Sequence, residues 1–120
     1  MEGFNIDWFV VVSALLFVCF DFLTGIIKAI VNKNVSSTIM REGLLHKSAF
    51  VLVIVLAIMC EAAMEHLDLG IAVPLLAPVC VYIILTEVAS ILENIAEINP
   101  ELKCSKMFAL FPSAKEEKDA

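Results

Sequence analysis

The sequence predicts an all-α integral membrane protein, a bundle of about three transmembrane helices. Hydrophobic residues make up 61% of its 120 residues and charged residues only 18%. This composition is far more apolar than that of a soluble domain of similar length. The apolar residues also gather in three runs, each close to the roughly 17–25 residues that cross a bilayer as a helix. We therefore expect residues 1–111 to form one membrane-embedded domain.

The first two predicted spans cover residues 8–30 and 47–65. The first is interrupted only by single polar or small residues and, as a helix, would be roughly 34 Å long. The second contains an unbroken apolar stretch from Ala49 to Cys60. With its flanking residues, this stretch also reaches the length that a bilayer requires.

The third predicted span covers residues 70–88, and its uncharged run is at the short end of the length that crosses a bilayer. Pro74 and Pro78 lie near its start, which favours a kink or a re-entrant segment there. In residues 89–99, apolar and acidic positions alternate with helical periodicity. We expect the third helix to continue there as an amphipathic cytoplasmic segment, followed by a polar, disordered tail at 112–120.

The basic residues predict the orientation, because Lys and Arg near the ends of spans are retained on the cytoplasmic side. None precedes the first span and none lies between the second and the third. This alternation predicts three spans, with the N-terminus outside and the C-terminus in the cytoplasm. Lys33, Arg41 and Lys47 are the expected cytoplasmic anchors. The full basic set is Lys28, Lys33, Arg41, Lys47, Lys103, Lys106, Lys115 and Lys118.

Four residues form a polar stripe on the first span: Asp21, Thr24, Gly25 and Lys28. A carboxylate near the bilayer centre costs about 2.5–3.5 kcal/mol, so a compensating partner is expected. Two interpretations remain open. The stripe either seals against a neighbouring helix near the inner interface, or lines water in an assembly.

A second polar set lies where the third apolar run ends. Glu87, Ser90 and Asn94 share one helix face, and Glu93 lies beside them. We interpret these four as candidate contacts between helices or subunits, with pairing to Lys28 or Lys47 as a hypothesis. A solvated acidic face is the alternative.

The sequence shows no recognisable catalytic, metal or cofactor motif. His46 and His66 have no nucleophile or second ligand at a typical spacing, and there is no glycine-rich phosphate loop. The formal net charge of −6 gives no support for nucleic-acid binding, which uses basic surfaces. We therefore expect no enzymatic activity, no cofactor, no metal and no nucleic-acid partner.

Two sequence blocks resemble a known family. Residues 21–29, the pair Ser36 and Ser37, and residues 41–47 resemble the N-terminal signature of the toxin-secretion and phage-lysis holins. Residues 87–94, followed by Pro100, resemble that family's second block. The resemblance covers about residues 21–102. It departs from the family at Thr86, where asparagine is common, and in lacking a glycine before Pro100.

The resemblance implies a multi-pass protein of the host bacterial cytoplasmic membrane, with the lipid bilayer and further copies of itself as partners. Such a homo-oligomer forms lesions through which an endolysin or a toxin leaves the cell, without any required direct binding of that cargo. Two alternatives remain: an antiholin that acts as the regulatory partner of a holin, and a small membrane channel.

Overall fold

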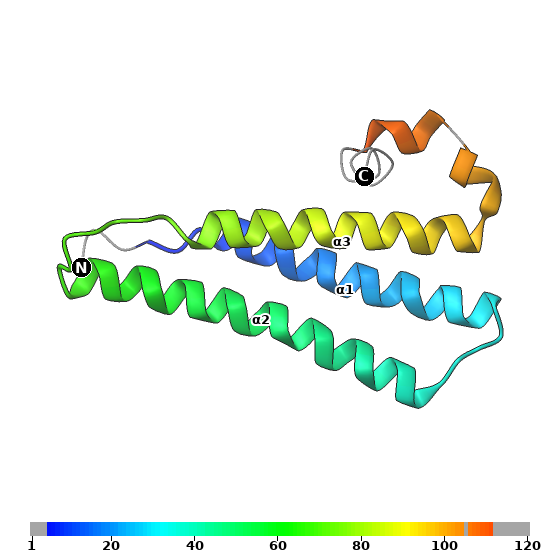
Figure 1. Ribbon diagram of the computed structural model, residues 1–120, viewed down its shortest axis with the longest axis horizontal. Helices are drawn as coiled ribbons and strands as arrows, with labels where there is room; N and C mark the ends of the chain where they lie inside the picture. The colour runs from blue at the N-terminus through cyan, green and yellow to red at the C-terminus, as the bar shows by residue number, and fades with distance from the viewer. Residues whose placement is uncertain (1–4, 105, 112–120) are drawn as a thin grey trace.

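The computed structural model describes residues 5–104 and 106–111. In these residues, three long α-helices are followed by two short 3-10 helices (Figure 1). The chain runs forward through α1, back through α2 and forward again through α3, so α1 and α3 point the same way. The elements are α1 (Trp8–Val31), α2 (Ser37–His66), α3 (Leu76–Ile98), η1 (Pro100–Cys104) and η2 (Lys106–Leu110).

Each of the three α-helices is long and apolar enough to cross a membrane, judged by length and composition. The predicted all-helical class is therefore confirmed, and the architecture is compatible with three spans. The predicted orientation of the termini remains a prediction, and the polar tail at 112–120 lies outside the described residues.

Two helices begin where a side chain accepts a hydrogen bond from the first turn. The Val10 amide donates to Oδ1 of Asp7 (3.3 Å), and the Ile39 amide donates to Oγ of Ser36 (3.4 Å). Such caps satisfy amides that have no partner inside the helix. Because Ser36 caps α2, this helix begins well before the predicted span at residue 47, and the segment expected to be a loop supplies its first turns.

The start of α3 differs from the sequence prediction. Residues 67–75 are not helical, and Gly70 has a left-handed backbone (φ 78°). The helix begins at Leu76, so Pro78 lies in the first turn, where its missing N–H costs no intrahelical hydrogen bond. The two prolines thus mark the beginning of α3 rather than a kink within it. The amphipathic segment predicted at 89–99 is continuous with α3 as far as Ile98.

A carboxylate from α2 completes the start of α3. The Leu75 amide donates to Oε2 of Glu61 at 2.8 Å, and the Leu76 amide donates to the same oxygen. A negative charge at this position also interacts favourably with the positive end of the helix dipole. Glu61 therefore joins the end of α2 to the beginning of α3.

The apolar core lies mainly between α1 and α3. Its side chains include small ones, with Ala14 on α1 and Cys80 on α3 both fully buried. Small residues allow helices to approach closely, which is how helices associate in lipid. The outer surface carries large apolar side chains such as Phe9 and Leu52, which are 82% and 68% exposed and suited to face lipid. The core residues are Val11, Ala14, Val18, Ile54, Ala57, Leu76, Cys80 and Ile83.

We predict that Ala14→Leu destabilises the bundle by about 1–3 kcal/mol, because the site has no room for added carbon atoms. The free energy of unfolding would be measured in detergent micelles by circular dichroism during titration with a denaturing detergent. Val12→Leu is the matched control, since Val12 is 49% exposed on the same helix. Equal stability of the two variants would contradict close packing of α1 against α3.

Candidate functional site: a polar cluster between the helices

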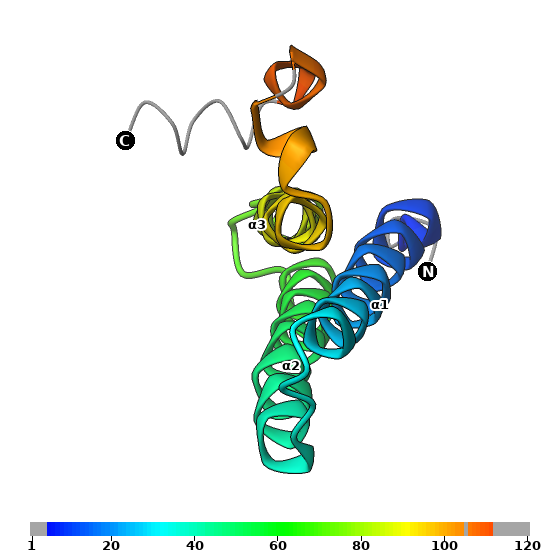
Figure 2. The same ribbon diagram turned by 90° about the vertical axis from the view of Figure 1, so that its right-hand side faces the viewer.

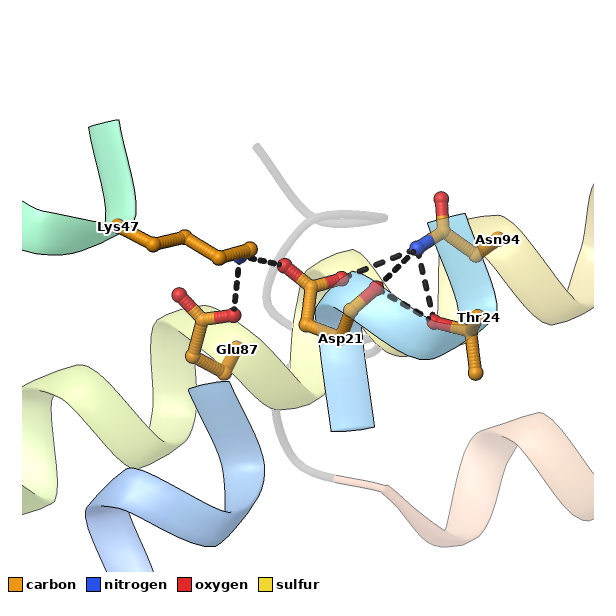
Figure 3. A network of polar contacts seen from close by, with 5 residues as sticks. All are labelled: Asp21, Thr24, Lys47, Glu87 and Asn94. Atoms are coloured by element: carbon orange, nitrogen blue, oxygen red, sulfur yellow. Dashed lines mark hydrogen bonds and ion pairs between the residues drawn. The ribbon is translucent and has the colours of Figure 1, made fainter. Parts of the chain in front are cut away.

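Five polar side chains meet between the three long helices (Figure 3). Four of them are buried with at most 6% exposure: Asp21 and Thr24 on α1, and Glu87 and Asn94 on α3. Lys47 of α2 is the fifth, and its side chain is 17% exposed. We call these five residues the polar cluster.

Lys47 joins all three helices. Its Nζ donates to Oε2 of Glu87 at 2.9 Å and also to Oδ2 of Asp21. One ammonium group thus lies between two carboxylates, and ionised hydrogen-bond partners of this kind form the stronger contacts in proteins. With both carboxylates ionised, the cluster keeps an excess of one negative charge.

Asn94 and Thr24 complete the cluster on its other side. The Asn94 Nδ2 group donates to Oδ1 of Asp21 (3.0 Å) and to Oγ1 of Thr24 (2.9 Å). The Thr24 hydroxyl donates to the Asp21 carbonyl oxygen at 3.0 Å. Within the described part of the chain, no buried side-chain nitrogen or oxygen lacks a hydrogen-bond partner. The cluster is therefore internally satisfied, as burial away from water requires.

The structure brings together only part of the residues singled out from the sequence. Lys28 pairs with Glu97 at 3.5 Å, with both side chains partly or largely exposed, and Glu87 pairs with Lys47 instead. Gly25 borders the cluster, because a Cβ atom added there would lie 3.8 Å from Asn94 Nδ2.

The other predicted positions lie at the edge of the cluster or away from it. Ser90 is half-buried on α3, and Glu93 is exposed on the same helix. Lys33 and Arg41 are exposed, in the connection to α2 and in its first turns. Their expected role as cytoplasmic anchors stays a prediction.

Sequence reasoning missed Glu61, which lies near the end of the predicted second span (residues 47–65) and was given no partner. Its distance from Lys47 was the available signal, because about four helical turns separate the two and place them on one face of a helix. Among the described residues, no group of three or more His, Cys, Asp and Glu side chains is arranged to hold a metal ion.

Three apolar helices that enclose a satisfied polar cluster define a small multi-pass membrane protein. A model of the bacteriophage holin family matches residues 3–109, and the chain belongs to this family. Searches of the curated proteins and of the solved structures found no match.

We predict that Lys47→Met destabilises the bundle by about 3–5 kcal/mol, because it leaves two buried carboxylates without their cation. Unfolding in detergent micelles, followed by circular dichroism, measures the effect. Lys33→Met is the control, since it removes an exposed lysine. Adding Asp21→Asn and Glu87→Gln to Lys47→Met should restore much of the stability. A Lys47→Met variant as stable as Lys33→Met would contradict the role of Lys47 in joining the helices.

Proposed function

We propose that the chain is a holin that accumulates in the bacterial cytoplasmic membrane, self-associates and opens lesions through which an endolysin or a toxin leaves. Family membership supports the general class. The observation that carries the proposal is the polar cluster, because it consists of polar side chains that water could solvate, buried inside a bundle whose outside is apolar.

In a single copy, the cluster is sealed. None of its fully buried side-chain nitrogen and oxygen atoms lacks a hydrogen-bond partner, so one copy exposes little polar surface from this region to lipid. If α2 leaves its place, Asp21 and Glu87 lose Lys47, and their carboxylates become a polar face on the α1 and α3 pair. Exposing charged groups to lipid is costly, so this face becomes stable only where neighbouring copies enclose water.

The proposed change therefore depends on the number of copies. Scattered copies remain closed, since an opened copy alone in lipid has no water to face. A ring of copies supplies that water, and each added copy contributes one more polar face to its wall. This dependence on assembly suits a protein that accumulates harmlessly and then acts on the membrane.

We also propose that the basic end of the bundle faces the cytoplasm. Lys28 lies at the end of α1, Lys33 in the connection that follows and Arg41 in the first turns of α2, whereas Glu65 and Asp68 lie at or just beyond the opposite end of α2. Lys and Arg are retained on the cytoplasmic side. The connection between α2 and α3 then lies outside.

We predict that single cysteines report this orientation in a variant whose native cysteines are replaced. In intact cells at low expression, Leu69→Cys should react with a membrane-impermeant thiol reagent. Asn34→Cys, in the connection between α1 and α2, should react only after the cells are permeabilised. Both positions are exposed, so the reverse pattern would contradict the orientation and not merely report poor access.

We predict abrupt lysis when the chain is induced in bacteria that hold a cytoplasmic endolysin, measured by culture turbidity and release of a cytosolic reporter enzyme. Lysis should require both proteins. Absent lysis at normal membrane accumulation would contradict the holin proposal and favour an antiholin or a small channel.

The same assay tests the cluster. Asp21→Asn should delay lysis, because it removes the excess negative charge and leaves Lys47 balanced by Glu87, which favours the closed bundle. Glu97→Gln is the control, since it neutralises an exposed carboxylate on α3. An onset unchanged or earlier than that of the control would contradict a role of the cluster in opening.

A further inference from the structure

Helix α2 is joined to the rest of the bundle far less closely than α1 and α3 are joined to each other. Only Ile54 and Ala57 of α2 are buried, although α2 is the longest helix. Its N-terminal end also diverges from α3, as Figures 1 and 2 both show. Apolar packing alone therefore holds α2 weakly.

Two polar contacts fix the position of α2. Lys47 binds Asp21 and Glu87, and Glu61 accepts the first amides of α3. The two contacts lie about four helical turns apart, roughly 21 Å along the axis. Both are directional and charged, so they recognise a particular acceptor surface rather than any apolar one.

We propose that α2 of one copy docks onto the α1 and α3 pair of a second copy, so that neighbouring copies exchange this helix. The proposal rests on the self-association proposed above and specifies the surface through which it occurs. The occupant is identified by its charges: an ammonium group placed to meet two carboxylates, and a carboxylate placed to meet the start of α3. A second copy of this chain carries both groups at the required spacing.

The cost of leaving charges unpaired favours this exchange over simple detachment. When α2 leaves its own bundle, Lys47 and the two carboxylates all lose their partners at membrane depth, which is strongly unfavourable. Docking on a second copy restores every one of these contacts. Exchange of an identical element between copies is a low-cost route to assembly for this reason.

The connections of α2 are long enough for exchange. Residues 67–75, which join α2 to α3, are not helical and when extended span roughly 30 Å. Residues 32–36, which join α1 to α2, span roughly 17 Å when extended. Neighbouring packed helices lie about 8–10 Å apart. Each connection, when extended, is therefore longer than the spacing between two packed helices.

The antiparallel register provides a direct test. Glu61 of α2 meets Leu76 of α3, so one turn further along each helix Ala57 lies at the height of Cys80. Both side chains are buried in the same core.

One tagged copy would keep Cys80 as its sole cysteine. A second, differently tagged copy would carry Ala57→Cys with all native cysteines replaced. Oxidation with a copper catalyst, or a short thiol cross-linker, then joins them only where α2 of one copy meets α3 of the other.

We expect a cross-linked pair of the two tagged copies in the membrane. Leu56→Cys in place of Ala57→Cys is the matched control, because Leu56 is 57% exposed at nearly the same height. It should give at least tenfold less product. A single chain that carries both Cys80 and Ala57→Cys is the packing control. A disulfide between these two cysteines, within one copy or between copies, shows that the substituted α2 still packs against α3.

The outcomes separate this inference from the proposed function. One outcome is that the two tagged copies co-purify while a cross-link forms only inside the single chain that carries both cysteines. In that case α2 stays in its own bundle, so the exchange is wrong, whereas self-association stands. Equal products from Ala57→Cys and Leu56→Cys would show unspecific collision and would also overturn the exchange. Failure of the copies to co-purify would overturn both proposals.

Discussion

The structure depends on one lysine that has to be neutralised inside an apolar bundle. Lys47 lies between Asp21 and Glu87, and these three residues come from three different helices. An unpaired charge inside an apolar bundle is costly, so the contact fixes the rotation of each helix about its axis. Asn94 donates to the other carboxylate oxygen of Asp21 and to the Thr24 hydroxyl, and these bonds join α1 directly to α3.

This constraint explains why the bundle is asymmetric. The helices α1 and α3 bury small and β-branched residues along their length, which supplies the van der Waals contact that holds helices together in lipid. Helix α2 contributes little of this contact and relies on Lys47, about three turns from its start, and on Glu61, near its end. Its outer face remains free to meet lipid or other copies. The bundle thus combines one permanent pair of helices with a third whose place is set by charge.

The sequence was sufficient for the helices and for some of the cluster, because both follow from local pattern. Hydropathy predicted three helices, and Asp21 and Glu87 stood out as carboxylates beside or within apolar runs. The pairing of Glu87 with Lys47 rather than Lys28 depends on how the helices are tilted and rotated, which no single run encodes. The early start of α2 was missed because basic residues suggested a loop, whereas the Ser36 cap extends the helix. Glu61 was missed because its partners are the backbone amides of Leu75 and Leu76, which no pattern of side chains identifies, so that its spacing from Lys47 was the only sequence signal.

Stability alone does not explain this cluster. Replacing a buried ion pair by well-packed apolar side chains is often neutral or stabilising, and α2 has ample apolar sequence around Lys47 with which to do so. The retained charges therefore point to a requirement other than stability. A polar face that is satisfied when closed, and that can be satisfied again by water or by another copy, allows two arrangements of the same helices. An apolar core would allow only the closed one, because its opened face would have nothing to gain from water. In the proposed function, the polar cluster is thus the feature that would make assembly and opening physically accessible to this small bundle.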